Sequence, residues 1–148
     1  MKITRFSLLA APWLWLAFAS TPAAAAAQAA PAIEQWHGPY GGFPTLTTQV
    51  LRGSDAWNGF WKQVGRDAPR ALDPAREMAV AVFIGERRTG GYVVSVVSAG
   101  TASGHFVVVY HEQAPGPDQF VTEALTTPWV VAVVPLSTQP VVFQAAAK

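Results

Sequence analysis

Three histidines are the first residues to consider for chemistry, because histidine serves as a metal ligand and as a general base. They are His37, His105 and His111. His105 and His111 fall at even spacing on one predicted strand and share a face, but six residues of strand span about 20 Å. One metal ion cannot bridge that distance, and the chain has no cysteine to complete a zinc site. The pattern therefore indicates half-exposed strand residues, and we expect no metal and no other cofactor.

Other catalytic patterns are also weak. Serine, histidine and aspartate are all present, but no serine lies in the strand–turn–helix setting that presents a nucleophile. Gly90-Gly91 follows one predicted strand and leads into another, whereas a phosphate-binding glycine loop opens a helix. We therefore predict no catalytic residue and a protein that is not an enzyme, with an enzyme of unrecognised type as the remaining alternative.

The N-terminus has the three-part order of a secretory signal peptide. Lys2 and Arg5 precede an apolar stretch over 6–19, and small residues follow it. The stretch is shorter than the roughly 20 residues that a membrane-spanning helix needs. We predict that residues 1–27 are cleaved and that the mature protein is periplasmic or secreted. Because no cysteine is present for lipid attachment, we expect no membrane association after cleavage.

The charge balance excludes a nucleic-acid partner. The whole chain has ten basic and nine acidic residues, a net charge of +1. Without Lys2 and Arg5, eight basic and nine acidic residues remain, so the net charge becomes −1. No basic field is left to attract nucleic acid.

The mature chain divides into a short lead-in and one domain. Residues 28–44 are predicted to be an irregular lead-in, because glycines and prolines interrupt them, and their aromatic residues should pack on the domain. Residues 45–148 form the domain, which begins with a strand over Thr45–Arg52. A helix follows, with Ser54 as N-cap and Gly65 at its end. Its apolar face consists of Trp57, Phe60, Trp61 and Val64, spaced for core packing.

Valine-rich strands fill the rest of the domain. Met78–Ile84 is apolar at every position, so it should be buried on both faces and central to its sheet. A turn over 100–104 and a Pro/Gly loop over 114–119 separate later strands. These are Tyr92–Ala99, His105–Gln113, Trp129–Val134 and Val141–Gln144. Short strands with one short helix favour a mainly β fold, an antiparallel β-sandwich or a partly open barrel.

The loops carry the residues best suited to binding. Because antiparallel strands alternate in direction, loops 85–91 and 114–119 should lie at the same end, with segment 126–129 beside them. Rigid loops that carry Arg and Trp are typical of protein-binding edges. The candidate protein-binding residues are Arg87, Arg88, Thr89, Gly90, Gly91, Tyr92, Pro115, Gly116, Pro117 and Trp129. Turn geometry explains the glycines equally well, and Trp129 could cap the core, so both interpretations stay open.

Several short motifs stand out in the domain, and Thr89-Gly90-Gly91-Tyr92 is the most specific. The others are Ser54-Asp55-Ala56-Trp57 with Trp61, Met78-Ala79-Val80, Gly85-Glu86-Arg87-Arg88, His111-Glu112-Gln113-Ala114-Pro115-Gly116-Pro117 and Ala124-Leu125-Thr126-Thr127-Pro128-Trp129. Over roughly residues 45–135 they resemble the C-terminal domain of the PrcB family, whose members are associated with exported proteases. The resemblance implies a non-catalytic, exported partner that helps a protease complex assemble or persist, and it supplies no catalytic residue.

A looser similarity supports an alternative function. Chagasin-like inhibitors of cysteine proteases are small β-sandwiches that wedge three loops into an active-site cleft. Loops 85–91, 114–119 and 126–129 occur here in the corresponding order, but the first lacks Asn-Pro, the second lacks a glycine pair, and Thr127 replaces an arginine. We therefore expect a binding module that stabilises an exported protease or another envelope protein, with a protease inhibitor as the alternative.

Overall fold

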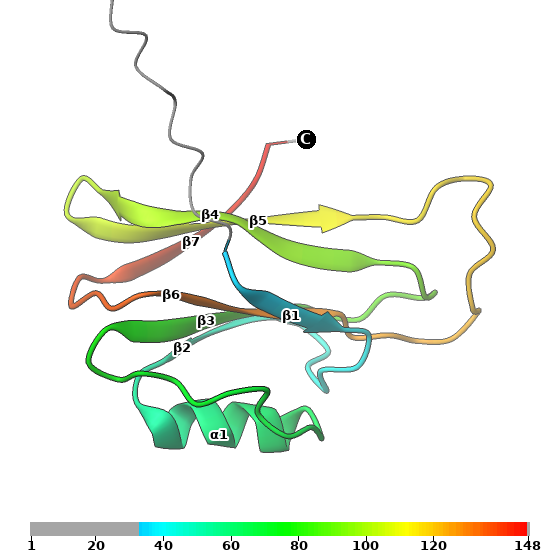
Figure 1. The fold of residues 1–148 in the computed structure, drawn as a ribbon. Coiled ribbons are helices and arrows are strands. Elements are labelled where there is room, and N and C mark those ends of the chain that lie inside the picture. Colours follow the sequence, from blue (N-terminus) through cyan, green and yellow to red (C-terminus); the bar gives the residue numbers. More distant parts are fainter. Residues whose placement is uncertain (1–32, 148) are drawn as a thin grey trace, which may run out of the picture. The chain divides into compact units, whose positions relative to one another are not determined.

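The fold is a β-sandwich with one helix, seen in a computed structural model that describes residues 33–147 (Figure 1). One sheet has four strands in the order β1-β6-β3-β2, and the other has three in the order β4-β5-β7. The strands are β1 (Gln35–Gly38), β2 (Leu46–Leu51), β3 (Glu77–Ile84), β4 (Val93–Ala102), β5 (His105–Gln113), β6 (Trp129–Pro135) and β7 (Val141–Ala145), and the helix is α1 (Ser54–Gln63). The predicted mainly β class is therefore confirmed, and the sheets form a sandwich without closing into a barrel. The predicted signal peptide lies outside the described residues.

Strand β3 is buried on both faces, as its continuous apolar sequence predicts. It lies between β6 and β2. Its even-numbered residues, such as Val80 and Val82, face the three-stranded sheet and join the core between the sheets. Its odd-numbered residues, including Phe83, face the opposite side and join a second core with α1. The structure therefore has three layers, with the helix on the outer face of the four-stranded sheet (Figure 1).

The helix packs against the four-stranded sheet through aromatic side chains. Trp57, Phe60 and Trp61 are buried, as predicted. Trp61 makes edge-to-face contacts with Trp57 and Phe60 at centroid distances of 5.4 and 5.5 Å, a favoured aromatic geometry. It makes the same kind of contact with Trp129 of β6 at 5.9 Å. The Trp57 indole N–H donates to the backbone carbonyl of Arg70 at 2.8 Å, which fixes the loop after the helix.

The two ends of α1 differ in how well the sequence predicted them. Gly65 ends the helix as expected: its N–H donates to the Lys62 carbonyl, and the next N–H, of Arg66, donates to the Trp61 carbonyl. These two bonds define a Schellman motif, and Gly65 has the positive φ of 70° that the motif requires. Ser54 is not the N-cap, however. It is the first helical residue, and Gly53 precedes it without any side-chain cap.

One turn and one strand pairing also differ from expectation. Strand β4 continues to Ala102, so the turn to β5 is only Ser103-Gly104, and both residues have positive φ. That conformation is the type I′ hairpin, whose twist matches the flanking strands. Strand β7 pairs with β5 in parallel. Each strand from β3 to β7 reverses direction, so β5 and β7 run the same way and become parallel once they are neighbours in one sheet.

The predicted lead-in contains a regular strand. Residues Gln35–Gly38 pair with β6 as β1, so only part of the segment is irregular. Trp36 of this strand packs against Trp57 and Trp61, as expected for an aromatic residue of this segment, whereas Tyr40 is 63% exposed. The Gln35 side-chain amide exchanges two hydrogen bonds with the backbone of Val96 on β4. Through that amide, β1 links the edges of the two sheets.

An ion-pair network holds the chain before β1 to the start of β3. The Arg70 guanidinium lies 2.7 Å from a carboxylate oxygen of Glu34 and 2.9 Å from one of Glu77. These charge-assisted hydrogen bonds raise the pKa of Arg70, with Glu34 as the larger cause. They also hold the pKa of the Glu77 carboxyl below its usual range, together with the backbone N–H of Asp73.

Trp61→Ala should lower the free energy of unfolding by about 3–5 kcal/mol, because it leaves a large cavity in the aromatic cluster. Chemical denaturation measures the loss. Lys62→Ala, at an exposed position of the same helix, is the control and should change stability by less than about 0.5 kcal/mol. A loss below about 1 kcal/mol for Trp61→Ala would contradict the burial of this face.

The Glu77 carboxylate should make stability depend on pH in the acid range. Because its native pKa is lowered, its contribution is complete above the unfolded-state pKa of about 4.3 and is lost as the pH falls through the native pKa. Glu77→Gln should be less stable than wild type by about 1 kcal/mol at pH 7, as expected for a partly exposed ion pair. The difference should disappear at the lowest pH. Unfolding curves from pH 7 to pH 2 test this, and a difference that stays constant would argue against it.

Candidate protein-binding surface

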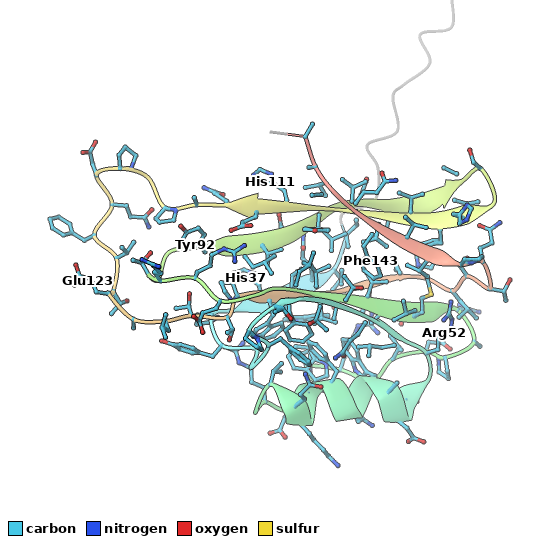
Figure 2. All side chains as sticks on the ribbon, turned by 180° about the vertical axis from the view of Figure 1, so that it is seen from behind. His37, Arg52, Tyr92, His111, Glu123 and Phe143 are labelled. Carbon is cyan, nitrogen blue, oxygen red and sulfur yellow. The ribbon has the colours of Figure 1, made fainter. Side chains whose placement is uncertain are left out.

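The loops at one end of the sandwich form a joined surface, which we call the rim and define as residues 85–92 and 114–128. The predicted placement of both loops at the same end is confirmed, since the N–H of Gly90 donates to the carbonyl of Thr122 at 2.9 Å. Arg87 and Thr126 form an isolated antiparallel bridge. Figure 2 shows Tyr92 and Glu123 at this end and Arg52 at the other. Backbone hydrogen bonds therefore join two loops that are far apart in the sequence.

The glycine pair permits this close approach. Gly91 has a φ of 84°, and a Cβ at this position would lie 2.7 Å from a Val121 methyl and 2.9 Å from the Pro115 ring. A larger residue would have to displace the second loop. The turn-based interpretation of Gly91 is therefore correct, because its backbone conformation and the close approach of Pro115 both require a glycine.

The two arginines of the rim have different roles. Arg87 forms a bidentate ion pair with Glu112 of β5, with N–O distances of 2.7 and 2.8 Å. The bond to Glu112 raises the pKa of the guanidinium, which also lies 5.8 Å from the centroid of the Tyr92 ring. Arg87 follows β3 in the four-stranded sheet, so this pair ties the two sheets together. Arg88 is exposed and makes no ion pair with any residue in the described part of the chain.

Several predicted binding residues do not reach the surface. Trp129 is 1% exposed and belongs to the core under α1, so the core-capping interpretation is correct for it. Gly90 is also buried. Thr89 is half-buried, and its carbonyl accepts a hydrogen bond from the buried Thr126 hydroxyl. That the remaining candidates bind a protein stays a prediction; those exposed or half-exposed are Arg87, Arg88, Thr89, Gly91, Tyr92, Pro115, Gly116 and Pro117.

The structure adds two residues that the sequence analysis missed. Phe120 is fully exposed, and Leu125 is 61% exposed. Both lie on the loop between β5 and β6, which extends away from the sandwich (Figure 1). A signal was present, since Phe120 is a large apolar residue in a loop otherwise rich in proline, glycine and polar residues. The rim therefore carries exposed apolar side chains as well as the charged Arg88.

A cleft of about 260 Å³ opens beside the rim, between the two sheets. Its lining residues are Leu46, Ile84, Arg87, Tyr110, His111, Glu112, Ala145 and Ala146. It forms because β7 ends at Ala145 opposite Tyr110, whereas β5 continues to Gln113. Leu46 on its wall is 58% exposed. The cleft is thus mainly apolar, with the neutralised Arg87–Glu112 pair at one side.

The described residues offer little for catalysis or metal binding. Within residues 33–147, no group of three or more His, Cys, Asp or Glu side chains is arranged to hold a metal ion. His105 and His111 lie near opposite ends of β5, and the His105 ring bonds locally to the Ser103 carbonyl. In the same range, no helix is both long and apolar enough to cross a membrane. What the arrangement presents is a surface of hydrogen-bonded loops with a cleft beside it.

Arg87 should contribute to stability, because its guanidinium pairs with Glu112 on the other sheet. A double-mutant cycle with Arg87→Ala and Glu112→Ala should give a coupling free energy of about 1 kcal/mol, because the pair is bidentate and partly buried. Arg88→Ala should change the free energy of unfolding by less than about 0.5 kcal/mol. Equal losses for Arg87→Ala and Arg88→Ala would show that the ion pair does not stabilise the fold.

Comparison with known proteins gave one match. No curated protein and no solved structure matched the sequence. Residues 78–135 match the family model described as PrcB C-terminal. The match runs from the second residue of β3 to the last residue of β6 and includes the whole rim, whereas α1 lies outside it. The resemblance inferred from the sequence is thereby confirmed over this span, where residues 78–135 are similar to the PrcB C-terminal family.

Proposed function

We propose that this protein is an exported, non-catalytic binding module that associates with a protease or protease complex and stabilises it. The observation that carries the proposal is the full exposure of Phe120 on a loop whose residues Thr122 and Thr126 are hydrogen-bonded to the neighbouring loop. Exposed aromatic residues on well-ordered loops are typical binding anchors, because they bury much area at little entropic cost. Association with a protease complex is what the family match implies.

The rim has the layout of a protein-binding surface. Phe120 and Leu125 supply apolar area, and the same two loops carry the exposed charged residues Arg88 and Glu123. An apolar centre with a charged border is the usual anatomy of such surfaces. The hydrogen bond from Gly90 to Thr122 and the bridge between Arg87 and Thr126 restrict loop motion, so little order has to be gained on binding.

The inhibitor alternative has less support from the geometry. It requires three exposed loops, but in the third, 126–129, both Thr126 and Trp129 are buried. Only 85–91 and 114–119 remain for insertion into an active-site cleft. We therefore favour stabilisation over inhibition.

The test is affinity capture of exported proteins with the mature chain, followed by identification of the bound protease and measurement of its affinity. The variant Phe120→Ser/Arg88→Ala should bind at least about tenfold more weakly, because anchor residues contribute about 1–3 kcal/mol each. Adding the wild-type protein should lengthen the lifetime of the isolated protease without lowering its peptide hydrolysis.

Leu136→Ser is the matched control, because Leu136 is an exposed apolar residue that follows β6 at the end opposite the rim. It should bind as wild type does. Loss of peptide hydrolysis on binding would support the inhibitor instead. Capture of no protease, or equal capture by all variants, would exclude the rim as the binding surface.

A further inference from the structure

The free edge of strand β2 is a second place where this protein can bind another chain. β2 is the terminal strand of the four-stranded sheet, and within residues 33–147 no strand pairs with its outer side. Its six residues pair with β3 in unbroken register. The residues from Leu46 to Leu51 include no charge and no proline. An edge of this kind is open to pairing with another strand, because charges, prolines and bulges are the usual means of blocking one.

The other edges are shorter or irregular. The edge of β4 has a register shift between Val96 and Ser98, and the Gln35 side chain occupies both backbone groups of Val96. β1 has only four residues, and β7 has five and follows directly after Pro140. β2 is therefore the longest edge strand with unbroken register among the described strands.

The register identifies the backbone groups that face outward on β2. The N–H of Ile84 on β3 donates to the Pro128 carbonyl, on the β6 side. Backbone groups alternate in direction along a strand of an antiparallel sheet, so Val82 and Val80 also face β6. Their register partners on β2 are Thr48 and Val50. These two residues consequently direct their N–H and C=O groups away from the sheet, where an added strand would receive them.

The cleft lies where the side chains of an added strand would point. Leu46 pairs with Ile84, a residue of the core between the sheets, so the Leu46 side chain is on the inner face of its sheet. A residue of an added strand opposite Leu46 would be on the same face. It would enter the cleft between Leu46, Tyr110 and Ala145. The cleft is mainly apolar, so it fits an apolar side chain.

We propose that β2 binds an extended segment of a partner protein, which adds to the four-stranded sheet as a further strand and places an apolar side chain in the cleft beside Leu46. This proposal rests on the proposed function and names its binding mode, strand addition. A second copy of this chain fits less well. In a twofold pairing centred on Thr48, Leu46 would face Val50 of the other copy, and Val50 already packs into its own core.

The experiment uses a phage-displayed library of peptides about 12 residues long, about twice the length of an average strand, panned against the mature protein. Peptides with apolar residues at alternate positions should be enriched. On binding, the amides of Thr48 and Val50 should gain protection from hydrogen exchange. Thr48→Pro removes one outward N–H that the β2–β3 ladder does not use, and it should weaken peptide binding at least about tenfold. Thr48→Val keeps that N–H and should bind within about threefold of wild type.

Leu46→Glu provides a second variant, since it places a charge in the cleft at an exposed position, and it should also weaken binding at least about tenfold. Three results would overturn the proposal: no enriched peptide, protection of amides other than those of β2, or protection of the β2 amides in the protein alone at high concentration, which would indicate self-association. If Phe120→Ser/Arg88→Ala loses protease capture and Thr48→Pro does not, strand addition fails while the proposed function stands.

Discussion

Strand β3 has no polar side chain between Met78 and Ile84, and this single constraint organises the fold. A strand that is apolar on both faces must be covered on both, because exposing either face leaves a large apolar area in water. The three-stranded sheet covers one face, and α1 covers the other. The backbone groups of β3 also need partners on both sides, which β2 and β6 supply.

The aromatic cluster under α1 follows from that arrangement. The face of β3 toward the helix carries small residues at Ala79 and Ala81, so large rings from α1 can approach the sheet closely. Trp61 lies at the centre of the cluster, in contact with four other rings. Its indole nitrogen has no hydrogen-bond partner among the described residues. The edge-to-face geometry allows an indole N–H to point at a ring face, which offsets part of the cost of burial.

The rim depends on the same core. Arg87 comes three residues after the end of β3 and pairs with Glu112 on the other sheet, so the position of the first loop is set by how the sheets pack. The N–H of Gly90 then donates a hydrogen bond to the carbonyl of Thr122, and this bond fixes the loop between β5 and β6. The exposed side chains of Phe120 and Arg88 are thus held by a frame that is rigid for reasons of stability. The two proposed binding modes use different parts of this frame, the loop surface and the open edge of β2.

The sequence by itself determined the features that local pattern and turn chemistry report. The apolar run of β3, the three-to-four spacing of Trp57, Phe60 and Trp61, and the glycine that ends the helix each predicted a structure that is present. The positions of the loops at one end followed from strand alternation alone. These features depend on residues close together in the chain, so their signals can be seen without knowing the fold.

The tertiary structure decided which residues are available at the surface. The ion pair of Arg87 joins residues 25 positions apart, and the Gly41 N–H bonds to the hydroxyl of Thr127, 86 positions away. No local pattern distinguishes Arg87 from Arg88, because only the packing of the sheets brings Glu112 to one of them. Burial of Trp129 and exposure of Phe120 have the same cause: a side chain is buried or exposed according to what lies across from it, and that neighbour comes from a distant part of the chain.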